Sequence, residues 1–219
     1  MAKSNYLSES ELLEKFRIAL TNAESQPDIA SALEEIGYDT AEIAKGKALW
    51  DEAEKVFEFN KKEDAETSLA YSEFKKKRDE LNHFYKLHRK KAKVVFRNEP
   101  ELLKQLKLDK ALPASYIKWL GTVKDFYSAA SAHENIKTKL QRLKVTPDEL
   151  SKGSEMIASL ESARAEYKRE VGESQDATKQ KDAALSKLED FMSEFYAIAA
   201  IALEDRPQLL ESLSKQVLS

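Results

Sequence analysis

Ala41-Glu42-Ile43-Ala44-Lys45-Gly46 is matched 107 residues later by Asp148-Glu149-Leu150-Ser151-Lys152-Gly153. When the chain is compared with itself at this offset, 20 identical pairs fall between residues 8–112 and 115–219, and no gap is needed. A sustained internal period is the signature of a repeated structural unit. We therefore predict a tandem duplication, with one repeat in residues 1–110 and the other in residues 111–219.

The spacing of apolar residues within each repeat indicates helices. Apolar side chains three and four residues apart lie on one face of a helix, and this spacing recurs in Leu13, Phe16, Leu20 and Ala23 and in their counterparts Leu120, Val123, Tyr127 and Ala130. Five glycines and five prolines in 219 residues are too few for a turn-rich β protein. The sequence predicts an all-α fold, in which each repeat is an elongated bundle of long up-and-down helices. Gly46 and Gly153 stand on matching apolar faces and predict close contacts between helices.

Capping residues mark where the helices begin. Ser8-x-x-Glu11 has the form of a capping box, and Thr146 precedes a proline at the first helical position. We expect a first helix over about 9–36 and 114–144, a second that begins at about 40 and 147, and a short closing helix over about 99–108 and 206–217. Pro27 predicts a break in the first repeat alone, because Glu134 stands at the matching position.

The sequence leaves open what happens after the second helix. Residues 60–68 and 168–176 are almost wholly polar, and Gly172 could end a helix. A turn there would give three helices of about 40 Å, whereas a continuous helix would be a rod of about 87 Å at 1.5 Å per residue. Residues 60–68 contain no helix breaker, which supports the rod. We favour the turn, because the first helix is only half as long as the rod and would leave one end of it uncovered.

Composition excludes several classes of protein. The formal charge of −3 argues against bulk attraction to nucleic acid or anionic lipid, and the absence of cysteine excludes disulfides and zinc–thiolate sites. No apolar run approaches the roughly 18 residues of a membrane span, and Met1 to Tyr6 contain no apolar signal region. We expect a cytoplasmic protein that does not enter the membrane.

Histidines are the candidate metal ligands. Glu80 and His83 have the Glu-x-x-His spacing of carboxylate-bridged metal bundles, but Lys187 and Asp190 occupy the matching positions, so the motif is not repeated. His88 lies in a core-facing register and could serve as a ligand or a pH switch, although a structural role is the simpler interpretation. We predict no metal and no cofactor.

The strongest asymmetry between the repeats is a basic segment over residues 75–97, whose counterpart, residues 182–204, is acidic. Its candidate partner-binding residues are Lys75, Lys76, Lys77, Arg78, Lys86, Arg89, Lys90, Lys91, Lys93 and Arg97. Three interpretations are open. The segment could be neutralised by the acidic residues of 28–66 or 182–204, it could bind an acidic protein, or it could track a phosphate backbone.

No catalytic constellation occurs in the sequence. It has no Gly-rich phosphate loop before a helix and no Gly-x-Ser-x-Gly elbow. We expect a non-enzymatic helical scaffold or protein-interaction module. Binding of nucleic acid or another polyanion through residues 75–97 is the first alternative, and a metal-binding bundle is the second.

Overall fold

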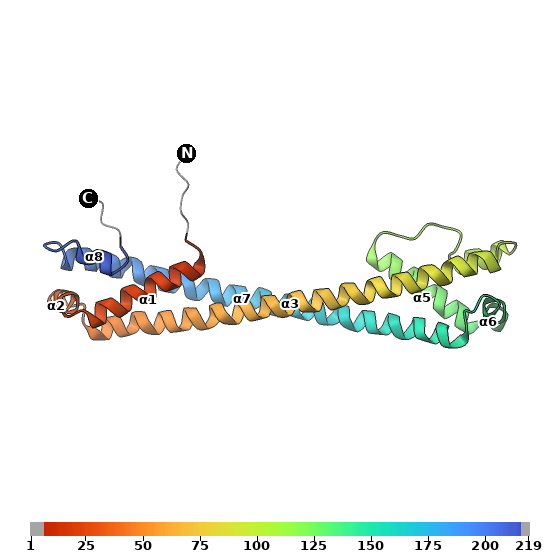
Figure 1. Cartoon of the computed structure of the whole chain (residues 1–219), viewed down its shortest axis with the longest axis horizontal. Helices are drawn as coiled ribbons and strands as arrows, with labels where there is room; N and C mark the ends of the chain where they lie inside the picture. The colour runs from red at the N-terminus through yellow and green to blue at the C-terminus, as the bar shows by residue number, and fades with distance from the viewer. Residues whose placement is uncertain (1–6, 216–219) are drawn as a thin grey trace, which may run out of the picture. The chain divides into compact units, whose positions relative to one another are not determined.

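The computed structural model describes residues 7–215, and within that range the chain is helical with no strand (Figure 1). The helices are α1 (Glu9–Ser25), α2 (Pro27–Glu35), α3 (Thr40–Val95), α4 (Pro100–Gln105), α5 (Tyr116–Ala132), α6 (Glu134–Gln141), α7 (Pro147–Ala202) and α8 (Leu209–Ser212). The predicted all-α class is confirmed. The closing helix predicted over 206–217 is shorter than expected, and its last residues lie outside the described range, as do Met1 to Tyr6. No helix in the described range is both long and apolar enough to cross a membrane.

The helices of the two predicted repeats have matching bounds. α1 and α5 each contain 17 residues, and α3 and α7 each contain 56, with starts 107 positions apart. Two predicted caps are present: Ser8 forms a full capping box with Glu11, and the Thr146 hydroxyl accepts a hydrogen bond from the Glu149 backbone N–H at 3.2 Å. The cap also predicted at Asn98 is wrong, since α4 begins after Glu99 with no side-chain cap. These bounds support the duplication, which itself remains a prediction.

α3 and α7 each continue as a single helix through the polar stretches at 60–68 and 168–176. The turn that we favoured there is therefore wrong. Gly172 lies inside α7, where one glycine costs only about 1 kcal/mol relative to alanine and does not end the helix.

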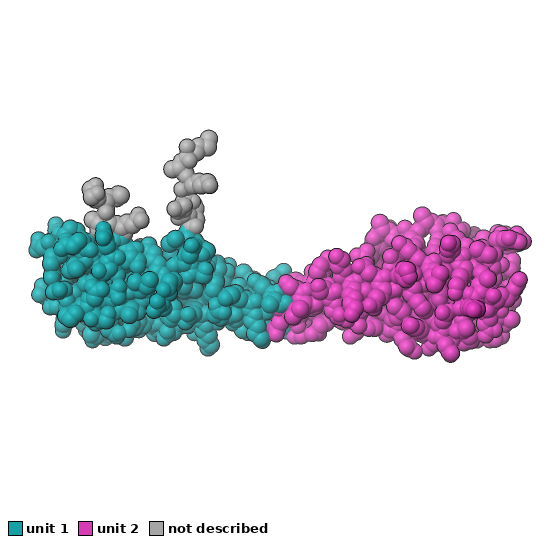
Figure 2. All heavy atoms as spheres, in the orientation of Figure 1, with its two compact units in different colours: residues 1–65, 173–219 teal, residues 66–172 magenta. Residues whose placement is uncertain are grey.

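The chain forms two compact units that alternate along the sequence (Figure 2). Unit 1 consists of residues 1–65 and 173–219, and unit 2 consists of residues 66–172. Each unit contains part of α3 and part of α7. The predicted division at residue 110 falls inside unit 2, so the compact units differ from the sequence repeats.

In unit 1, α1 packs on the beginning of α3 and the end of α7. The Phe16 ring lies 6.4 Å from the Tyr196 ring, and Trp50 donates a hydrogen bond from Nε1 to the Leu13 carbonyl at 2.8 Å. The two long helices run antiparallel, since Asn60 bonds to Thr178 near one end of the unit and Tyr38, just before α3, packs on Phe195. We had expected the chain to turn within residues 60–68 and fold back over the beginning of α3. The end of α7 packs there instead.

Unit 2 repeats this arrangement with the other parts of the same helices. α5 packs on the end of α3 and the beginning of α7, and its core includes Leu81, Val123 and Leu160. Thr67 bonds to the Glu170 carbonyl at 3.0 Å, and Tyr71 lies 5.3 Å from Tyr167, so the long helices are antiparallel here as well.

Both predicted glycine contacts are confirmed. A Cβ atom on Gly46 would lie 2.4 Å from the Phe191 ring, and one on Gly153 would lie 2.2 Å from the Tyr127 ring. Such distances are shorter than a carbon contact allows, so any side chain at these two positions would force the ring above it to move.

The first helix of each repeat is broken, not only that of the first repeat. The break before Pro27 is as predicted, but the chain also breaks at His133, whose backbone is extended (φ −108°, ψ 113°). There is no proline at that position. The break turns the chain into α6, which buries Ile136 and Leu140 in the core, and this burial accounts for a break without a proline.

Candidate functional site

The basic segment at 75–97 belongs to unit 2, on the second half of α3 and in the turn that follows it. Seven of its ten cationic side chains are exposed, and no ion pair is described for them within residues 7–215: Lys75, Lys76, Arg78, Lys86, Lys90, Lys93 and Arg97. They are available to a binding partner.

Arg89 is the clear exception, because it is buried. Its guanidinium donates hydrogen bonds to the carbonyls of Lys107 at 2.8 Å and Leu108 at 3.4 Å, and also to that of Lys110. Cations are favourable beside the free carbonyls at the end of a helix. Arg89 therefore anchors the chain after α4 and is not a partner-binding residue.

Two more of the predicted residues make contacts inside unit 2. Lys77 is half-buried, with its Nζ 3.1 Å from Glu73 and 3.0 Å from the Ser159 hydroxyl. Lys91 is also half-buried and donates to the Lys144 carbonyl at 3.4 Å. These contacts reduce their availability, so the exposed part of the segment is the better candidate.

The acidic stretches that could have neutralised the segment belong to the other unit. Residues 28–65 and 182–204 lie in unit 1, whereas residues 75–97 lie in unit 2. Unit 2 holds 23 Lys and Arg against 15 Asp and Glu, a formal charge of +8. Unit 1 holds the remaining 13 and 24, a charge of −11, which together restores the net −3. The small net charge thus conceals two strongly and oppositely charged units.

One side of α3 in unit 2 combines cations with exposed apolar groups. Lys86, Lys90 and Lys93 are four and three residues apart, so they lie along one side of the helix. Leu87 and Val94, seven residues apart, border them and are 47% and 56% exposed. We call these five residues the basic face. Sequence reasoning found its cations but missed the two apolar residues, whose spacing of seven was the available signal.

His88 is fully buried on the opposite side of α3. Its Nδ1 lies 3.1 Å from the Tyr127 hydroxyl, its Nε2 lies 3.5 Å from Glu149, and its ring packs 4.3 Å from the Phe84 ring. Burial lowers the pKa of His88 below its ordinary value of 6.5, and the Glu149 carboxylate opposes that effect. His88 is therefore a core residue that joins α3, α5 and α7.

Glu80 and His83, the other candidate metal ligands, are both exposed. Among the described residues, neither His83 nor His88 belongs to a group of three side chains that could hold a metal ion. The arrangement gives no support to a metal site at His83 or His88.

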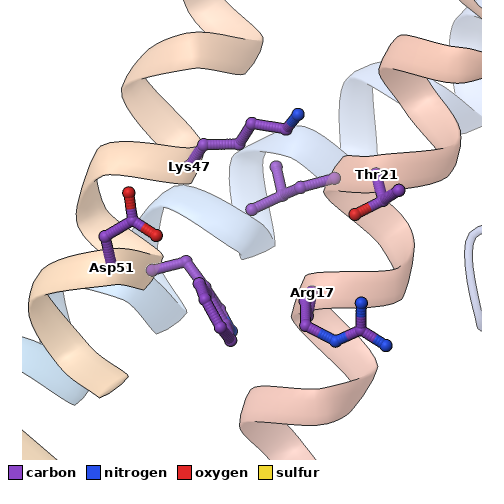
Figure 3. Close-up of a pocket in the computed structure, with 6 residues that line it drawn as sticks. Arg17, Thr21, Lys47 and Asp51 are labelled. Atoms are coloured by element: carbon purple, nitrogen blue, oxygen red, sulfur yellow. The ribbon is translucent and has the colours of Figure 1, made fainter. Parts of the chain in front are cut away.

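A pocket in unit 1, between α1 and α3, was not predicted (Figure 3). It has a volume of about 220 Å³ and is lined by Arg17, Leu20, Thr21, Lys47, Trp50 and Asp51. Its two cations already have partners, since Arg17 pairs with Glu14 at 2.7 Å and Lys47 pairs with Glu24. Ligand pockets are typically about 300–1,000 Å³, so we assign no ligand to this smaller one.

Comparison with protein-family models, with curated proteins and with solved structures gives no match to this chain.

Proposed function

We propose that this protein is a non-enzymatic interaction module that binds an acidic partner protein through the basic face of unit 2. One observation carries the proposal: Lys86, Lys90 and Lys93 are exposed, have no described acidic partner, and border Leu87 and Val94. A cytoplasmic location remains part of this proposal.

The mixture of charged and apolar groups favours a protein as the partner. Complementary charge steers a partner and fixes its orientation, whereas burial of apolar groups contributes to affinity in a way that salt does not screen. Polypeptides can offer carboxylates and apolar side chains on one surface. The basic face is suited to a helix or extended segment that does so.

Affinity capture from the native host tests this proposal with three forms of the protein. The wild type is compared with a variant of the basic face, Lys86→Glu/Lys90→Glu/Lys93→Glu, and with the control Lys104→Glu/Lys118→Glu/Arg142→Glu. The control reverses three other exposed cations of unit 2. We expect a protein partner to be retained by the wild type and the control and lost by the basic-face variant. No captured protein at either low or physiological salt, or equal capture by all three forms, contradicts the proposal.

Binding of a polyanion is the second candidate, because three cations in line along one side of a helix could follow a phosphate backbone. The two apolar residues discriminate between the candidates. Leu87→Ser/Val94→Ser weakens binding of a protein partner but leaves a phosphate backbone nearly unaffected. Electrophoretic shift assays with DNA and RNA over a range of salt concentrations test the polyanion directly, and no shift at low salt contradicts it.

A further inference from the structure

A second exposed face lies on α7 in unit 1, and two of its three residues are offset by 107 from residues of the basic face. Glu194 and Ile201 correspond to Leu87 and Val94 of the basic face, and Asp190 corresponds to His83, which lies outside it. All three are exposed, and Ile201 is 65% exposed. Their spacings of four and seven residues place them along one side of α7. We call these three residues the acidic face.

The acidic face resembles the basic face in form but has the opposite charge. Each combines charged side chains with an exposed β-branched apolar residue, Val94 on one and Ile201 on the other. No ion pair is described for Asp190 or Glu194 within the described range. Glu204 and Asp205 add exposed negative charge directly after α7, as Arg97 adds positive charge directly after α3.

We propose that the partner of the basic face is a second copy of this chain, which presents its acidic face. This inference rests on the proposed function, because it names the occupant of the same face. Complementary charge is the argument: the basic face belongs to a unit of charge +8 and the acidic face to a unit of charge −11. A contact of one surface with a different surface of the next copy is a heterologous interface.

The faces also determine how strong the association is. Exposed ion pairs are individually weak and are screened by salt, and only Leu87, Val94 and Ile201 add exposed apolar surface. The self-association is therefore weak, and it depends on both protein concentration and ionic strength.

Sedimentation of the full chain over a series of protein concentrations tests the inference. At about 0.01 M salt charges act over about 30 Å, and at about 1 M salt over about 3 Å. We expect the average mass to rise above 24.9 kDa with concentration at low salt and to return to 24.9 kDa at high salt. A mass of 24.9 kDa at every concentration in low salt overturns the inference.

A charge exchange between the two faces gives the sharper test. Lys86→Glu/Lys90→Glu/Lys93→Glu makes both faces acidic, and Asp190→Lys/Glu194→Lys makes the acidic face basic. Each variant alone should stay at the monomer mass at low salt, and the two mixed should associate again. All five positions are exposed, so helical circular dichroism and the unfolding midpoint should match those of the wild type.

The outcomes separate this inference from the proposed function. If the mixed variants stay monomeric, self-association through these faces is overturned. If in addition the basic-face variant loses a partner from the host while the control retains it, the proposed function stands with a different acidic protein as the partner.

Discussion

The two glycines of α7, Gly153 and Gly172, differ in how much space a side chain would have. A Cβ atom on Gly153 would clash with the Tyr127 ring, whereas one on Gly172 would meet nothing within 4 Å. We predict that Gly153→Ala destabilises the fold by about 1–3 kcal/mol through overpacking. Gly172→Ala should stabilise it by about 0.5–1 kcal/mol, because alanine is the better helix former. Urea unfolding of both variants measures these changes, and equal effects of the two substitutions would contradict the close contact at Gly153.

The buried His88 should make the stability of the fold depend on pH. Its pKa in the folded state lies below 6.5, its ordinary value, so the unfolded chain binds a proton at a higher pH than the folded chain does. The free energy of unfolding should therefore fall as the pH drops through about 6.5 and should be unaffected by this group above that value. We predict that the free energy of unfolding falls less between about pH 7 and pH 5 in His88→Phe/Tyr127→Phe than in the wild type. This double substitution also removes the hydroxyl bonded to the histidine.

Urea unfolding at a series of pH values compares the two proteins. Carboxylates elsewhere contribute to both pH profiles, so the difference between the profiles is the relevant quantity. Parallel profiles would show that His88 does not titrate differently in the folded and unfolded states.

At the scale of the element, the continuity of α3 can be tested where we had favoured a turn. Ala65 is exposed and lies inside α3. Proline in a helix interior removes a backbone hydrogen bond and clashes with the preceding turn, so Ala65→Pro should cost about 3 kcal/mol or more. Ala65→Gly is the matched control and should cost only about 1 kcal/mol. If the proline variant unfolds at the same urea concentration as the glycine variant, α3 does not continue through this position.

The starts of α1 and α7 were predictable from sequence because capping is a local interaction. Ser8 and Thr146 bond to backbone groups only three residues away, so the pattern of residues contains the whole signal. The close contacts at Gly46 and Gly153 were also predictable. Glycine is a poor helix former, so its presence on the apolar face of a helix indicates that a neighbour packs too closely for a side chain. Local sequence did not decide whether α3 and α7 are continuous helices. The lack of a helix breaker at 60–68 supported continuity, but the choice depended on which helices cover the rest of α3. In the structure, α5 covers the half of α3 that α1 leaves open.

The same difference applies to the candidate site. The cations at 75–97 were visible in the sequence, but burial of Arg89 depends on carbonyls 18 to 21 residues away in the chain. Whether the remaining cations were neutralised depended on which acidic segment shares their unit. The structure shows that residues 28–65 and 182–204 belong to the other unit, and no ion pair is described for seven of the cations within residues 7–215.

At the scale of the whole molecule, each core takes residues from both halves of the chain. The core of unit 1 joins Leu13 and Leu20 to Leu188 and Phe195, and that of unit 2 joins Leu81 and Tyr85 to residues of α5 and α7. We predict that a fragment of residues 1–110 does not fold as a monomer, and nor does a fragment of residues 111–219. Mixing them at equal concentrations should restore helical circular dichroism and a cooperative thermal transition. A monomeric fragment that melts cooperatively by itself would contradict the shared cores.

The segment that joins α4 to α5 affects how the fold responds when the protein is diluted. Neither half of the chain can cover its own long helix alone, because α1 or α5 reaches only half of that helix, so the two halves must meet to complete either core. Were they separate molecules, their meeting would become rarer as the protein was diluted. Since residues 106–115 connect them, each half has the other at a high and fixed local concentration. Dilution of the protein should therefore leave the fold intact.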